Sequence, residues 1–133
     1  MLEKHVELEN AYLKVRSKEE AKLLIDSCSE DDVMFSTHDP NGIYNDVSKT
    51  CETLIGYSKK DLIGSSPYDY FNPEDFQAIL KSHAKVTIRP EVDRVNYRIR
   101  KKDGTFQPVR SLSRQIKDSS GLEFIFVVTF SGH

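Results

Sequence analysis

The first 29 residues carry a pattern of apolar and charged positions that predicts helix. They contain neither proline nor glycine and are rich in glutamate, lysine, leucine and alanine, all of which favour helix. Ser17 with Glu20 three residues later has the spacing of a capping box, which satisfies free backbone N–H groups where a helix begins. The sequence therefore predicts two helical pieces with a break at Ser17. One side of the second piece carries Ala21, Leu24, Ile25 and Cys28.

A β-hairpin is predicted next, because two β-favouring runs flank a tight-turn sequence. The runs are residues 33–37 and 43–47. Between them, residues 39–42 read Asp-Pro-Asn-Gly, where proline fixes one backbone angle and glycine tolerates a positive φ. Residues 36–39 place a histidine beside an acid, but neighbours on a strand point to opposite faces. We therefore assign this stretch to the hairpin and not to a catalytic dyad.

Short helices and one longer helix are predicted in the middle of the chain. Ser48 and Ser58 are suitable caps for short helices, and Gly56 and Gly64 are suitable ends. Residues 72–75 read Asn-Pro-Glu-Asp, the strongest helix start in the sequence, because a capping amide, a proline at the first helical position and two acids act together. The longer helix carries Phe76, Ile79, Leu80 and His83 on one face.

From residue 93 onward the period of the apolar positions changes from that of a helix to that of a strand. Val95, Tyr97 and Ile99 alternate with polar side chains. Turn sequences ending in glycine then separate two further β-favouring runs, residues 105–116 and 122–130. The three runs predict an antiparallel meander.

The last run is apolar on both faces from Phe124 to Val128, so both sides of the sheet need a cover. The N-terminal helix or a partner subunit would supply it. The order of elements predicts an α+β fold, with helices gathered on one face of a five-stranded antiparallel sheet. We divide the chain into an N-terminal helical extension, residues 1–30, and one domain, residues 31–133.

Four segments, in this order, resemble the sequence blocks of sensory PAS domains over about residues 31–130. They are residues 39–42 (Asp-Pro-Asn-Gly), 54–64 (Leu-Ile-Gly-Tyr-Ser, followed by Asp-Leu-Ile-Gly), 71–75 (Phe-Asn-Pro-Glu-Asp) and 97–104 (Tyr-Arg-Ile-Arg-Lys-Lys-Asp-Gly). The resemblance implies a small pocket between the sheet and a wall of helices, with output through helices at the termini. It also implies a parent signal-transduction protein such as a histidine kinase, whose output domain would lie elsewhere in the same protein.

The patterns supply candidates for that pocket and for contacts of the extension. A dry core without a ligand is the alternative for the pocket residues. The candidate pocket residues are Met34, Tyr44, Tyr97, Ile99, Ser111, Phe124 and Phe126 on the sheet, and Cys51, Leu54, Leu62, Phe76, Ile79, Leu80 and His83 on the helices. The candidates for dimerisation or signal relay are Leu13, Leu24, Ile25, Cys28, Ile125 and Val127.

Cofactor chemistry has little support in these residues. His83 lies in the general region that supplies the haem ligand in haem-binding PAS domains, but only its helical position matches. Photoactive flavin-binding relatives carry a cysteine on a short helix where this chain has Pro-Tyr-Asp-Tyr-Phe-Asn at residues 67–72. Cys51 has no neighbouring base in the sequence, so we assign it to the core. We therefore expect no cofactor, with haem or flavin as lesser alternatives.

Composition and charge exclude several functional classes. The chain has 133 residues, enough for one domain, with 38% hydrophobic and 30% charged residues, as in a soluble globular protein. Its net charge is −2 and its lysines and arginines are interleaved with acids, which argues against nucleic-acid binding. The two cysteines lack the spacing of a metal site, and no apolar run is long enough to span a membrane. We expect a cytoplasmic chain without direct membrane contact.

These observations lead to one main hypothesis and its alternatives. No phosphate-binding glycine loop or nucleophile motif is visible, so we expect no enzyme. The main hypothesis is a sensory PAS module that binds a small molecule and forms a homodimer through its N-terminal helix and outer sheet face. The first alternative is a ligand-free scaffold for protein interaction, and the second is a small catalyst using Cys51 or His83.

Overall fold

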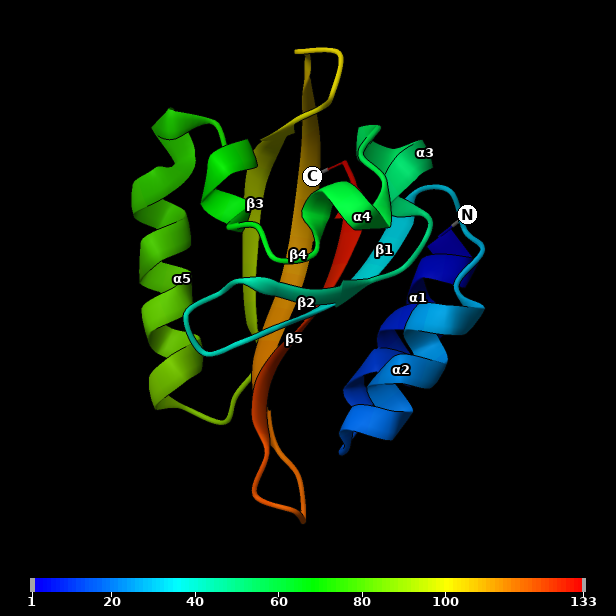
Figure 1. The fold of residues 1–133 in the computed structure, drawn as a ribbon, viewed down its shortest axis with the longest axis vertical. Helices are drawn as coiled ribbons and strands as arrows, with labels where there is room; N and C mark the ends of the chain where they lie inside the picture. Colours follow the sequence, from blue (N-terminus) through cyan, green and yellow to red (C-terminus); the bar gives the residue numbers. More distant parts are fainter. Residues whose placement is uncertain (1, 133) are drawn as a thin grey trace.

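The structure, a computed structural model, describes residues 2–132 and has the predicted α+β architecture (Figure 1). The helices are α1 (Leu2–Leu13), α2 (Lys18–Ser27), α3 (Cys51–Ile55), α4 (Lys59–Leu62) and α5 (Phe76–Ile88), with the 3-10 turns η1 (Pro67–Tyr70) and η2 (Pro73–Asp75). The strands are β1 (Val33–His38), β2 (Tyr44–Val47), β3 (Asp93–Arg100), β4 (Phe106–Lys117) and β5 (Glu123–Ser131). Within the described residues these five strands form one antiparallel sheet in the order β2-β1-β5-β4-β3.

The predicted break in the N-terminal helix is confirmed at Ser17. The Ser17 hydroxyl accepts a hydrogen bond from the backbone N–H of Glu20 at 3.1 Å. The Glu20 carboxylate accepts from the backbone N–H of Arg16 at 2.8 Å, one residue earlier than in a standard capping box. This turn folds α1 and α2 into a hairpin of two adjacent helices, which we call the α1–α2 hairpin (Figure 1).

The sheet is covered on both faces, as its last strand requires. On the inner face, α3, α4, η1 and α5 enclose one buried core that includes Leu54, Leu62 and Ile79. On the outer face, the α1–α2 hairpin closes a second core over the aromatic residues of β5. Figure 1 shows the hairpin on the opposite side of the sheet from α5. Of the two covers that the sequence allowed, the chain's own N-terminal helices are the one present.

The faces that we predicted for β5 are wrong by one residue. Phe124 and Phe126 lie in the outer core beneath the hairpin, whereas Ile125 and Val127 face the inner side. The register is fixed by pairs such as Phe126 with Arg114 on β4. A strand that is apolar at every position has no alternation to mark its faces, and a shift of one residue exchanges them.

Two buried side chains hold the end of α1 against the sheet. The Tyr12 hydroxyl donates to the carbonyl oxygen of Phe126 at 2.6 Å, and the two rings lie 4.8 Å apart. Burial raises the pKa of Tyr12, which keeps this donor protonated. Arg114 Nη2 donates to the carbonyl oxygens of Tyr12 and Val15 at 2.6 and 2.7 Å. The hairpin is therefore anchored by polar contacts inside an apolar layer.

Candidate functional site

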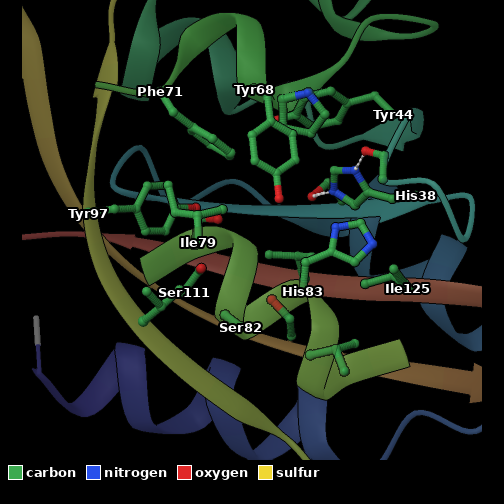
Figure 2. Close-up of a pocket in the computed structure, with 18 residues that line it drawn as sticks. His38, Tyr44, Tyr68, Phe71, Ile79, Ser82, His83, Tyr97, Ser111 and Ile125 are labelled. Atoms are coloured by element: carbon green, nitrogen blue, oxygen red, sulfur yellow. Dashed lines mark hydrogen bonds between the residues drawn. The ribbon is translucent and has the colours of Figure 1, made fainter. Parts of the chain in front are cut away.

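The inner side of the sheet contains a small, partly open cavity of about 90 Å³ (Figure 2). Residues of β1, β2, β3, β4 and β5 form one wall, and α5 and η1 form the other. None of the described residues that line it is Asp, Glu, Lys or Arg. Cavities for drug-sized ligands usually exceed about 300 Å³. This cavity is suited to a few water molecules or to a very small uncharged solute.

A buried histidine lies at one end of the cavity. One ring nitrogen of His38, Nδ1, lies 2.9 Å from the carbonyl oxygen of Gly42, and the other, Nε2, lies 2.8 Å from the Ser36 hydroxyl. A carbonyl oxygen only accepts, so Nδ1 carries the proton of the neutral ring. Nε2 then accepts from Ser36. Burial lowers the pKa of His38 to about 4, so the ring is neutral at physiological pH.

Sequence reasoning missed His38 as a site residue. We paired the histidine with the adjacent acid Asp39, whose carboxylate instead accepts from the backbone N–H groups of Asn41 and Ile43. Ser36 and His38 are two positions apart on one strand and therefore share a face. That spacing was the signal available in the sequence, because it places the Ser36 hydroxyl within hydrogen-bonding distance of the buried His38 ring.

The cavity also contains a hydroxyl group that lacks a partner. The Tyr68 hydroxyl is buried and, within residues 2–132, makes no hydrogen bond. Figure 2 shows it pointing into the cavity between Tyr97 and His38. Tyr97 differs, because hydrogen bonds with Ser111 and Thr129 accompany its burial, although burial still raises its pKa. Tyr68 is therefore the cavity group with unused hydrogen-bonding capacity.

His83 lies where the loop between β1 and β2 meets α5, and its side chain is partly exposed. Its Nε2 lies 3.2 Å from the carbonyl oxygen of Pro40, and its ring stacks against Tyr68 with centroids 6.5 Å apart. The nitrogen needed for a haem ligand is thus engaged with the backbone, and the cavity beside it is far smaller than a porphyrin requires. These residues do not fit haem.

Replacing Gly42 by alanine is expected to lower the free energy of unfolding by about 1–3 kcal/mol. Gly42 has φ +94°, and an added Cβ would lie 3.2 Å from Cε1 of His83. The control is Gly64→Ala, since Gly64 has φ +88° and open space around its Cβ position. Urea denaturation of both variants separates backbone strain from the His83 contact. Equal losses in the two variants would contradict a close approach of the loop to α5.

The structure brings together part of the predicted pocket. Five predicted residues line the cavity: Tyr44, Ile79, His83, Tyr97 and Ser111. Five others are buried in the inner core and do not line it: Met34, Cys51, Leu54, Leu62 and Ile99. Burial raises the pKa of the Cys51 thiol to about 11, which disfavours the nucleophilic thiolate.

Four predicted pocket residues are placed elsewhere. Phe124 and Phe126 lie on the outer face. Leu80 is 49% exposed, and Phe76 is only half-buried, with its ring edge-on to Tyr68. The buried face of α5 is formed by Ile79, Ser82 and Val86. Because Ser82 is polar, we did not assign it to the buried face from the sequence. The predicted face therefore included Leu80 and His83 in place of Ser82 and Val86.

The predicted relay residues divide between the two cores. Ile25 and Cys28 are buried in the outer core, and Leu13 and Leu24 pack against it. Ile125 and Val127, which we expected on the outer face, line the cavity instead.

The described residues contain neither a membrane-spanning helix nor a metal-binding cluster. Within residues 2–132 no helix is long and apolar enough to cross a membrane. In the same part of the chain no group of three or more His, Cys, Asp or Glu residues is placed to hold a metal ion.

Comparison with known proteins identifies relatives of this fold. A family model described as PAS fold matches residues 44–130. The Drosophila melanogaster protein Cycle is 29% identical over 97 residues, which are 72% of this chain and 24% of that protein. Mouse basic helix-loop-helix ARNT-like protein 2 is 29% identical over 53% of this chain and 12% of its own length. Human Period circadian protein homolog 3 is 35% identical over 41% of this chain and 4% of its own length. The chain thus spans a quarter or less of these relatives.

Solved structures of PAS domains resemble this one in three dimensions. The PAS-B domain of Drosophila melanogaster Cycle, solved with bound ethylene glycol, has a TM-score of 0.66 and 27% identity, covering 74% of this chain and 97% of that one. The PAS domain of a protein from Colwellia psychrerythraea has a TM-score of 0.71 and 20% identity, covering 86% of this chain and 95% of that one. The matched family model, which spans most of the sheet, and these shared folds show that the chain belongs to the PAS fold family.

Proposed function

We propose that this PAS domain is a protein-interaction module of a signalling protein, and that its α1–α2 hairpin transmits changes within the domain to a partner. The observation that supports this is the alternation along β5. Phe124 and Phe126 contact the hairpin, while Ile125 and Val127 line the cavity. Each cavity residue of β5 is therefore next in sequence to a residue that contacts the α1–α2 hairpin. A ligand or partner that binds one arrangement of β5 and the hairpin more tightly increases the population of that arrangement.

The relatives favour interaction over the histidine kinase that the resemblance first led us to expect. Their names belong to basic helix-loop-helix and circadian proteins. In this proposal the domain binds and does not catalyse, and it acts in the cytoplasm. We also propose that a separate output domain carries the response of the parent protein.

The partner that we propose is a second copy of this chain, bound through the outer surface of the hairpin. Val6 on α1 is 59% exposed and Leu23 on α2 is 69% exposed. Each lies near the middle of its helix, and the two helices are adjacent. Exposed apolar side chains on two paired helices are suited to helix–helix contact.

Leu23→Glu is expected to abolish self-association, because it places a charge in the centre of this contact. Sedimentation velocity over a range of concentrations measures the effect. The matched control is Leu80→Glu on α5, which changes a residue of similar exposure on the other side of the sheet. Wild-type protein that stays monomeric at every concentration would contradict the homodimer.

A second candidate function is the binding of a small uncharged hydroxyl compound in the cavity. The unpaired Tyr68 hydroxyl and the absence of charged side chains among the described lining residues support it. The PAS-B domain of Cycle was solved with ethylene glycol, a molecule of the size and polarity that this cavity would accept.

Tyr68→Phe is expected to weaken ethylene glycol binding by about five-fold, the value of one hydrogen bond of about 1 kcal/mol. Chemical-shift changes of Ser111 and Ile125 during a titration report binding in the cavity. Tyr57→Phe is the control, since Tyr57 packs against Tyr70 and lies outside the cavity lining. A titration that moves no cavity signal in the wild-type protein would remove this candidate.

A further inference from the structure

A second recess lies where β4 passes the end of α1. It is a groove of about 340 Å³, lined by the connection between α1 and α2, the loop between α5 and β3, and the end of β4. Its described lining includes Arg16, Arg114 and Lys117 and no acidic residue. The cavity on the inner face has no charged lining, so the two recesses suit different ligands.

Arg114 is a buried charge without a carboxylate partner. Its residue is 8% exposed, and among the described residues no Asp or Glu lies within ion-pair distance of it. Nη2 is occupied by the carbonyl oxygens of Tyr12 and Val15. The buried Nε–H has no acceptor within residues 2–132. Buried guanidinium groups are normally paired and fully hydrogen-bonded, so part of this group's capacity is unused.

A second arginine lies close to the first. Nη1 of Arg16 donates to the carbonyl oxygens of Leu13 and Val15 at 3.0 and 3.1 Å. The Val15 oxygen thus accepts from both arginines, which places the two donating nitrogens within about 6 Å of each other, where like charges repel. Burial lowers the pKa of Arg114 and the charge of Arg16 lowers it further, while Tyr12 and the charge of Glu20 act in the opposite direction.

The acidic groups nearby are already engaged. The Glu20 carboxylate accepts from the backbone N–H of Arg16 and lies 3.2 Å from the Ser17 hydroxyl. Glu123 pairs with Lys117 at 3.8 Å. The carbonyl groups at the end of α1 offset part of the arginine charge through the helix dipole. The Glu20 charge also acts on Arg114, but within residues 2–132 neither guanidinium group forms an ion pair with a carboxylate.

We propose that this groove binds a phosphate group between Arg16 and Arg114, with Lys117 at its rim. A phosphate carries about two negative charges and several acceptor oxygens, which match two guanidinium groups better than one carboxylate does. The groove exceeds the size of the phosphate itself, so the ligand class is a small phosphate ester.

Titration calorimetry with inorganic phosphate and with O-phosphoserine, each against chloride at equal ionic strength, tests the site. Saturable one-site binding of at least one probe is expected, together with shifts of the Arg16 and Arg114 Nε–H signals in proton–nitrogen correlation spectra. Arg16→Gln is expected to weaken binding at least ten-fold, the value of one charge-assisted hydrogen bond. Arg16 is exposed, so this variant keeps the fold that Arg114→Gln would put at risk.

Arg100→Gln is the matched control, because Arg100 is also an exposed arginine that donates to a backbone carbonyl, that of Asp69. Its affinity is expected to equal that of the wild type. Three results would overturn the site: no saturable binding of either probe, equal affinity in Arg16→Gln and wild type, or binding that leaves the Arg114 Nε–H signal in place.

Discussion

Replacing Tyr12 by alanine is expected to lower the free energy of unfolding by about 3–5 kcal/mol, the usual cost of removing a large buried aromatic side chain. Tyr12 is fully buried, its ring packs on Phe126, and its hydroxyl bonds the Phe126 carbonyl. The variant also removes the ring beneath the Arg114 guanidinium, 5.1 Å away. Urea denaturation followed by circular dichroism, with linear extrapolation to water, measures the loss.

Tyr12→Phe is the matched control for this prediction. It keeps the ring and its packing and removes only the hydroxyl, so a loss of about 1 kcal/mol is expected. The ratio of the two losses shows how far packing exceeds the hydrogen bond in holding the hairpin. If Tyr12→Ala is as stable as Tyr12→Phe, then α1 does not contribute to the folded core.

Acidification from pH 7 to pH 4 is expected to lower the free energy of unfolding by about 3 kcal/mol through His38 alone. The pKa of His38 is lowered from 6.5 to about 4 in the folded protein, with burial as the main cause. Between these two values the unfolded chain binds the proton and the folded chain does not, so stability falls as the pH falls. This contribution levels off about one unit above pH 6.5, where the unfolded chain no longer binds the proton.

The groups around His38 modify the shift without reversing it. The hydrogen bond to Gly42 and the charge of Asp39 raise its pKa, and the charge of His83 lowers it. Asp61, Asp103 and Asp118 have pKa values below the usual 3.8 because of hydrogen bonds, so their contributions are lost only below about pH 4.

His38→Gln separates the His38 contribution from other effects of acid. Glutamine keeps a polar side chain that does not titrate, so the curve of stability against pH is expected to flatten between pH 6.5 and 4. A curve for His38→Gln that is parallel to that of the wild type would show that His38 is not the buried titrating group.

Local chemistry made most of the fold predictable from the sequence. The break at Ser17, the turn at residues 39–42 and the helix start at Asn72 depend on caps and turn residues acting within a few positions of each other. The first two are present in the structure, and Asn72 caps the 3-10 turn η2, which leads into α5 at Phe76. Such signals do not depend on the tertiary arrangement, so they can be recognised in one sequence.

Long-range choices were the part that the sequence did not determine. The faces of β5 are set by its pairing with β1 and β4, and an all-apolar strand does not record that choice. The buried face of α5 includes Ser82. A search for a stripe of apolar residues cannot find a face that contains a serine. His38 needed a partner two positions away, and we paired it with its neighbour instead.

Arg114 is a buried residue that we did not identify from the sequence. It stands between Leu112 and Ile116 on the outer side of β4, and both of these neighbours are buried. An arginine in the middle of a buried alternation indicates a polar contact across the layer. Its acceptors are carbonyl groups at the end of α1, about 100 residues earlier in the chain, and no local pattern identifies them.

The anchored hairpin has a practical consequence for protein engineering. The family model begins at residue 44, so a designer who takes that boundary, or begins at β1, would leave Phe124, Phe126 and Phe130 facing water. An exposed aromatic surface of this kind favours aggregation. A chimeric protein that includes this domain should therefore contain the chain from Leu2 onward, with any new linker attached ahead of α1.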